Sequence, residues 1–146
     1  MISTNRFCAG ALVCTLLLIG TARLGAQPAP AGELYQALHR LNELGSILLV
    51  AAHPDDERSE LLAYFAKGRY MRAAYLSLTR GEGGQNLLGS EQGAALGVLR
   101  TQELLAARRI DGGEQFFTRA IDFGFSKSAD ESIQKWGRDQ VVSDLV

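Results

Sequence analysis

A buried strand that runs directly into a charged turn is the feature that most constrains this chain. The apolar run from Ile47 to Ala51 predicts a strand over residues 46–51 that is buried on both faces. The sequence Ala52-His53-Pro54-Asp55-Asp56-Glu57 follows at once, and residues 57–67 then have the pattern of a helix that ends at Gly68. A polar turn between a strand and a helix is expected at the carboxyl edge of a parallel sheet, where open α/β folds bind ligands.

This turn, residues 52–57, is called the elbow below. It carries one imidazole and three carboxylates within five positions. Adjacent acids repel one another unless a cation or protons offset their charge, and His53 followed three residues later by Asp56 is a plausible metal-binding pair. The alternative is a solvated loop whose aspartates cap the next helix. The strand and the helix on either side of the elbow favour a ligand site.

The elbow also carries a resemblance to a known family. The run 51–57, followed by Thr79-Arg80-Gly81-Glu82-Gly83, resembles the PIG-L/LmbE family of zinc-dependent N-acetylglucosaminyl deacetylases. The resemblance extends from about Ser46 to the end of the chain. It implies that His53 and Asp56 bind Zn²⁺ and that Asp55 is the general base that activates the attacking water.

The same resemblance implies two further expectations about the site. The loop that contains Arg80 borders the sugar site in this family, so Arg80 is expected to bind substrate, unless the loop is a solvated surface turn. The family's third zinc ligand is a histidine far downstream, whereas the only other histidine here is His39, upstream of the elbow. His39 is expected to be a surface or packing residue.

The fold class follows from alternating strand and helix patterns. They predict an α/β, Rossmann-like parallel sheet with flanking helices and right-handed crossovers. The predicted strands are 46–51, 72–77 and 115–119, and the predicted helices are 33–44, 57–67 and 93–109. In the last of these helices, Val98 and Leu105 are expected to belong to the apolar stripe.

Both ends of the chain have distinctive patterns. Arg6, the apolar run 9–19 and small residues up to Ala26 predict a signal peptide over residues 1–26, and therefore export to the periplasm or the exterior. A retained anchor helix is the alternative. Both cysteines, Cys8 and Cys14, lie in this segment, so the mature chain is expected to have no disulfide and no membrane span.

After the predicted signal peptide, residues 27–45 are expected to form a linker and a short helix. Residues 46–146 are expected to form the N-terminal part of a deacetylase-like α/β domain. Residues 129–146 predict one helix with a stripe at Ile133, Gly137, Val141 and Leu145, and this helix has no stop signal. The expectation is a fragment, the N-terminal portion of a longer protein that is truncated at its C-terminus. Such a fragment is expected to be prone to aggregation.

Charge and motifs exclude several functions. The chain has 15 basic and 16 acidic residues, a net charge of −1 and no basic stripe, which argues against nucleic-acid binding. The glycines of residues 81–84 lack the spacing of a nucleotide-binding loop, and Asp122-Phe123-Gly124 lacks the partners of the kinase motif that it matches.

The sequence therefore predicts a zinc-dependent hydrolase that removes the acetyl group from an N-acetylglucosamine-like sugar. Its substrate would be a small molecule or a glycan that carries N-acetyl groups. The alternative is a non-catalytic carbohydrate-binding module, or a decayed remnant of the same fold.

Overall fold

The computed structural model describes residues 29–146. The expected signal peptide and both cysteines lie outside the described residues. Within them, Gly32–Val146 forms a compact unit. Its elements are α2 (Ala31–Arg40), β1 (Ser46–Ala51), α3 (Ser59–Ala63), the π-helical turn η1 (Tyr64–Gly68), β2 (Arg72–Ser77), α4 (Ala94–Asp111), β3 (Glu114–Phe117), α5 (Ala129–Trp136) and α6 (Arg138–Leu145).

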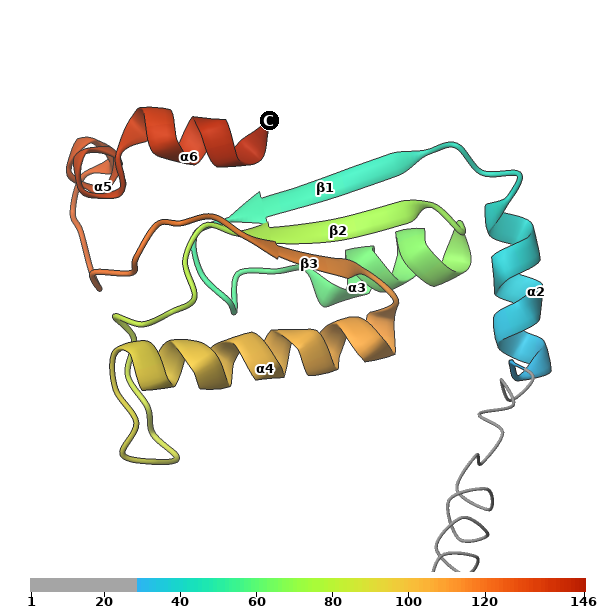
Figure 1. The fold of residues 1–146 in the computed structure, drawn as a ribbon, viewed down its shortest axis with the longest axis horizontal. Coiled ribbons are helices and arrows are strands. Elements are labelled where there is room, and N and C mark those ends of the chain that lie inside the picture. The colour runs from blue at the N-terminus through green and yellow to red at the C-terminus, as the bar shows by residue number, and fades with distance from the viewer. Residues whose placement is uncertain (1–28) are drawn as a thin grey trace, which may run out of the picture. The chain divides into compact units, whose positions relative to one another are not determined.

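The three strands form one parallel sheet in the order β1-β2-β3 (Figure 1). Ser46 pairs with Arg72 at one end of the first pairing, and Ala51 pairs with Ser77 at the other. The second pairing runs from Ala74 opposite Glu114 to Ser77 opposite Phe117. All three strands therefore end at the same edge, and the fold is the predicted α/β, Rossmann-like one.

The core lies between the sheet and the helices that follow β1 and β2. Both α3 and α4 lie on the same face of the sheet in Figure 1. The buried cluster in this layer consists of Leu62, Ala66, Ala73, Tyr75 and Leu104. Because side chains alternate along a strand, Ile47, Leu49 and Ala51 of β1 also point into this layer.

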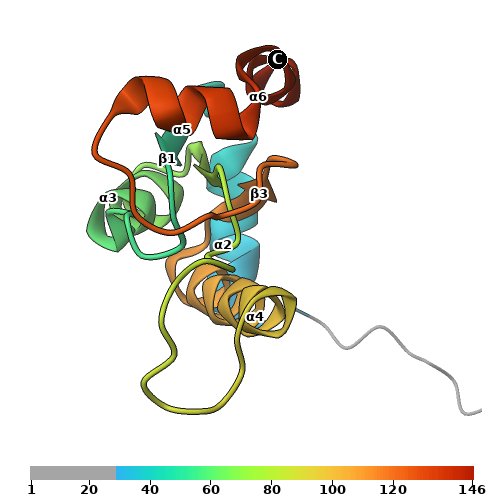
Figure 2. The ribbon, with the colours of Figure 1, turned by 90° about the vertical axis from the view of Figure 1, so that its left-hand side faces the viewer.

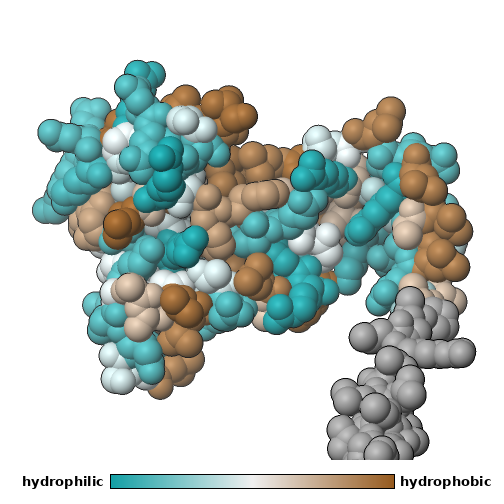
Figure 3. Space-filling view, in the orientation of Figure 1, coloured by the Kyte–Doolittle hydropathy of each residue, from teal (hydrophilic) through white to brown (hydrophobic). Residues whose placement is uncertain are grey.

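The prediction that β1 is buried on both faces is wrong. Leu48 and Val50 remain 47% and 48% exposed on the face that is opposite to α3 and α4. Hydrophobic surface is visible where β1 lies (Figure 3). The physical reason is position, because β1 is an edge strand of the described sheet, whereas the central strand β2 is buried over Ala73–Ser77.

The C-terminal helical segment differs from its prediction. It divides into α5 and α6 at Gly137, which has a φ of +75°, a conformation that glycine adopts without strain. The two helix axes point in different directions, as a comparison of Figures 1 and 2 shows. The Ser128 side chain caps α5 by accepting a hydrogen bond from the Glu131 backbone N–H.

The other predicted elements are confirmed with shifted ends. The helix predicted at 93–109 continues to Asp111 and ends at Gly112, whose φ is +82°. The helix predicted at 57–67 begins at Ser59, and the strand predicted at 115–119 covers Glu114–Phe117. The helix predicted at 33–44 is α2, whose His39 stacks on Tyr70 with ring centroids 4.7 Å apart.

Across residues 29–146, no helix combines the length and the apolar composition that a membrane crossing requires.

Candidate functional site

The elbow is a compact turn that backbone and side-chain hydrogen bonds hold in place. The backbone N–H of His53 donates to Oδ2 of Asp56 at 3.0 Å, and the N–H of Asp56 donates back to the His53 carbonyl at 3.3 Å. The buried Tyr75 of β2 donates its hydroxyl hydrogen to the same carbonyl. The central strand therefore fixes the backbone position of His53.

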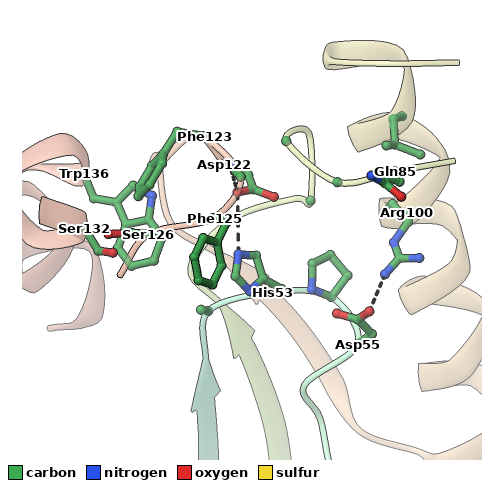
Figure 4. A pocket seen from close by; sticks show the side chains of 17 residues that line it. His53, Asp55, Gln85, Arg100, Asp122, Phe123, Phe125, Ser126, Ser132 and Trp136 are labelled. Atoms are coloured by element: carbon green, nitrogen blue, oxygen red, sulfur yellow. Dashed lines mark hydrogen bonds and ion pairs between the residues drawn. The ribbon is translucent and has the colours of Figure 1, made fainter. Parts of the chain in front are cut away.

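Two carboxylates flank the imidazole of His53. Its Nδ1 atom lies 3.5 Å from Oδ2 of Asp56. Its Nε2 atom lies 3.5 Å from Oδ1 of Asp122, a residue of the segment after β3 (Figure 4). The Asp122 side chain is only 3% exposed, and its Oδ1 also accepts the backbone N–H of Gly124 at 2.9 Å. A carboxylate therefore lies near each nitrogen of the ring.

Asp55 points away from this pair and into solvent. Its carboxylate is 73% exposed, and its Oδ2 lies 3.2 Å from Nη2 of Arg100 on α4 (Figure 4). Arg100 also lies 3.7 Å from a carboxylate oxygen of Glu103. The side chains of the two adjacent aspartates are thus separated. Asp56 lies beside the imidazole of His53, whereas Asp55 is exposed to solvent.

Glu57, the third acid of the elbow, belongs to a buried charge cluster behind the site. Its Oε1 lies 3.3 Å from Nη2 of Arg108, and the same nitrogen lies 2.7 Å from Oδ2 of Asp111. The guanidinium lies over the ring of Tyr75, 5.7 Å from its centroid. Two carboxylates around one buried guanidinium anchor the end of the elbow to α4.

The loop after β2 packs against the segment after β3. Oε2 of Glu82 accepts the backbone N–H groups of Arg80 at 3.2 Å and of Asp122 at 3.3 Å. The approach is so close that a Cβ on Gly83 would lie 2.4 Å from the backbone nitrogen of Gly124. Glycine is therefore required at position 83, and this contact helps to place Asp122 opposite His53.

A cavity of about 540 Å³ opens at this edge of the sheet. It combines polar side chains of the elbow and α4 with an aromatic wall from the segment after β3. The residues that line it include His53, Asp55, Gln85, Arg100, Asp122, Phe123, Phe125, Ser126, Ser132 and Trp136. In Figure 4 the aromatic side chains lie on one side of His53, and Asp55, Gln85 and Arg100 lie on the other.

The residues expected from the sequence do not all meet in this cavity. His53 and Asp55 line the cavity. Asp56 is not among the lining residues, but its carboxylate lies beside Nδ1 of His53. Arg80 is exposed and lies over the ring of Phe117, 5.1 Å from the centroid, and it does not belong to the cavity lining.

Sequence reasoning missed Asp122 and Arg100. Asp122 belongs to the tripeptide that the sequence analysis excludes as a kinase motif, and its position shortly after the third predicted strand is the signal that could have placed it at the same sheet edge. The only local signal for Arg100 is an ion pair with Glu103, three residues further along the helix, which the structure contains. Its contact with Asp55 depends on the fold, which brings the elbow next to α4.

The donor set fits half of a zinc site. Two ligands at 2.0–2.2 Å from a tetrahedral zinc lie roughly 3.4 Å apart, close to the distance of 3.5 Å between Nδ1 of His53 and Oδ2 of Asp56. Asp122 on the other ring nitrogen matches the carboxylate that commonly orients a metal-binding histidine. Within residues 29–146, no group of three or more His, Cys, Asp or Glu side chains is arranged to hold a metal.

A protein-family model matches most of the chain. The model of the PIG-L family, described as GlcNAc-PI de-N-acetylase, matches residues 48–146, which include the elbow, the loop after β2 and the segment after β3. No curated protein sequence matches significantly.

Proposed function

The chain belongs to the PIG-L family, whose description is GlcNAc-PI de-N-acetylase, and we propose that its elbow catalyses zinc-dependent removal of the acetyl group from an N-acetylglucosamine-like sugar. Family membership supports a deacetylase-like hydrolase function. The observation that carries the finer proposal is the separation of the two elbow aspartates: Asp56 lies beside His53, whereas Asp55 is exposed in the cavity.

His53 and Asp56 would hold the zinc ion, and Asp122 would orient His53. When bound, zinc supplies Lewis-acid chemistry that polarises the amide carbonyl and makes water more acidic. We propose that the third ligand is a histidine downstream of residue 146 in a longer protein. Two ligands alone make a weak site, because catalytic zinc usually has three protein ligands.

Asp55 is assigned as the general base. Its carboxylate accepts a proton from the attacking water as the oxygen of that water adds to the amide carbon. The proton then passes to the sugar nitrogen as the C–N bond breaks, which gives acetate and a free amine. Arg100, 3.2 Å from Asp55, holds the carboxylate in position.

Arg80 is assigned a contact with the part of the substrate that extends beyond the cavity. Its guanidinium is exposed on the ring of Phe117, and its planar fork suits hydroxyl, phosphate or carboxylate groups. We also propose export of the protein, with cleavage after Ala26. N-terminal sequencing of the exported protein should then begin at Gln27.

Acetate release tests the proposed function. The protein, extended to include the downstream histidine, should release acetate from a soluble N-acetylglucosamine derivative. A chelator should abolish the release, and added zinc should restore it. Binding of the sugar without any acetate release, in the zinc-loaded protein, would favour the alternative of a non-catalytic carbohydrate-binding module.

A further inference from the structure

The aromatic wall of the cavity is not used by the proposed chemistry. It consists of Phe123, Phe125 and Trp136, which come from the segment after β3 and from α5. Trp136 is fixed by a hydrogen bond of 3.1 Å from its indole N–H to the carbonyl of Ile121. Phe123 packs on Trp136 at a centroid distance of 5.7 Å, so these two rings form a preset surface.

Phe125 stands apart from that pair. It is 84% exposed although it lines the cavity. No ring contact of Phe125 occurs among the aromatic pairs of residues 29–146. An aromatic side chain gains much from burial, so an exposed ring on a cavity wall is suited to cover a ligand.

Hydroxyl groups are interspersed with these rings. Ser126 and Ser132 line the same side of the cavity, and their Oγ atoms lie within hydrogen-bond distance of the Ser128 carbonyl, at 3.0 and 3.4 Å. A wall of rings and hydroxyls matches a pyranose, which has an apolar face of C–H bonds and an edge of hydroxyls. Both hydroxyls donate within the protein, and Glu131 is a further acceptor for Ser126 at 2.7 Å. Each oxygen can therefore still accept a hydrogen bond from a sugar hydroxyl, a donor that a hydrocarbon chain lacks.

We propose that this wall is a second saccharide subsite, which binds the sugar unit next to the one that is deacetylated. The inference rests on the proposed function, because His53 and Asp55 define where the acetylated unit lies. The cavity of about 540 Å³ is larger than one sugar ring requires, and the aromatic wall lies on the side of His53 opposite Asp55 and Arg100. The preferred substrate is therefore a glycan of at least two units, not free N-acetylglucosamine.

The single tryptophan of the chain makes the subsite directly measurable. Trp136 fluorescence should change when a ligand covers the wall, whether or not any turnover occurs. We would titrate the full chain with N-acetylglucosamine and with its β-1,4-linked disaccharide, N,N′-diacetylchitobiose. The disaccharide should bind about tenfold more tightly than the monosaccharide, as expected for an added aromatic contact.

Phe125→Ala should weaken disaccharide binding by about tenfold and leave monosaccharide binding within about twofold. Phe125→Tyr should restore tight binding, because the ring is kept. Phe116→Ala is the matched control, since Phe116 is a half-exposed phenylalanine that lines a different groove of the sheet. Melting curves by circular dichroism would show that the variants remain folded.

Equal affinity for the two sugars, or disaccharide binding that Phe125→Ala leaves unchanged, would overturn the subsite. So would the absence of any fluorescence response. A different result would contradict the proposed function. Suppose that disaccharide binding depends on Phe125, but the zinc-loaded protein that includes the downstream histidine releases no acetate. That result would refute the deacetylase and keep the subsite.

Discussion

The Nε2 atom of His53 lies 3.5 Å from Oδ1 of Asp122, which joins the loops after the first and third strands at one edge of the sheet. The two residues are 69 positions apart in the sequence, and only the parallel order β1-β2-β3 brings them together. Asp122 is almost fully buried and is held by the backbone N–H of Gly124, so its carboxylate is a fixed partner for the imidazole.

Asp122→Asn should therefore weaken zinc binding by about 10- to 100-fold, the usual effect of losing a carboxylate that orients a metal-binding histidine. The amide keeps the shape of the side chain, so the fold should be retained. Zinc affinity by competition with a chelating dye measures the effect. Asp130→Asn, on the exposed first turn of α5, is the control and should bind zinc like the unmodified chain.

The two aspartates of the elbow should be separable in a protein that contains the downstream histidine. Asp55→Asn should lower deacetylation by about 10²–10⁴-fold, because the amide cannot accept the proton, while zinc content stays near normal. Asp56→Asn should lower zinc content, because a neutral amide is a poorer ligand. Metal analysis beside acetate release distinguishes the two. Loss of zinc in Asp55→Asn together with unchanged zinc and activity in Asp56→Asn would reverse the assignment.

Arg108 should matter more to stability than its neighbour Arg109. Arg108→Met leaves Glu57 and Asp111 buried without their common partner, so the free energy of unfolding should fall by about 3–5 kcal/mol. Arg109→Met, on the exposed side of α4, should change it by at most about 0.5 kcal/mol. Urea unfolding followed by circular dichroism compares the two. Equal effects would contradict the anchoring role of the buried cluster.

Tyr75 should make stability depend on pH in alkaline solution. Burial, with a smaller contribution from the charge of Glu57, raises the pKa of Tyr75 from 10 to about 12. Between these values the unfolded chain has lost the phenolic proton and the folded chain has kept it. The stabilisation is therefore complete below pH 10, and it is lost at up to about 1.4 kcal/mol per pH unit as the pH rises toward 12.

Tyr75→Phe should remove this part of the alkaline slope, as measured by urea unfolding at a series of pH values. Tyr64→Phe, which replaces a half-exposed tyrosine, should keep the slope. An identical slope in all three proteins would show that Tyr75 does not retain its proton in the folded chain.

The fold could be predicted from local patterns, whereas the full site could not. Alternation of apolar strands and helices placed β1 and β2 correctly, and the elbow with its surroundings was recognisable from residues 51–57. The burial of α4 was different. The sequence suggested Val98 and Leu105, but Val98 is 60% exposed and the buried face includes Arg108 and Asp111. Periodicity alone does not predict a buried arginine such as Arg108, because its burial depends on Glu57, a partner from a distant part of the sequence.

The same limit applies to Asp122 and Arg100. Each contacts a residue of the elbow that is more than forty positions away, so only the three-dimensional fold shows the pair. The break at Gly137 was missed for another reason. A glycine within a helical stripe reads as a tolerated small residue, and only its φ of +75° reveals a turn between two helices.

A zinc titration of paired histidine variants tests the central claim most directly. The chain has two histidines, His53 in the elbow and His39 on α2, and calorimetry can compare His53→Ala with His39→Ala, with Cys8 and Cys14 replaced by serine in each protein. We predict weak binding of one zinc ion that His39→Ala preserves and His53→Ala abolishes. Binding that persists unchanged in His53→Ala would contradict the assignment of the elbow as the metal site.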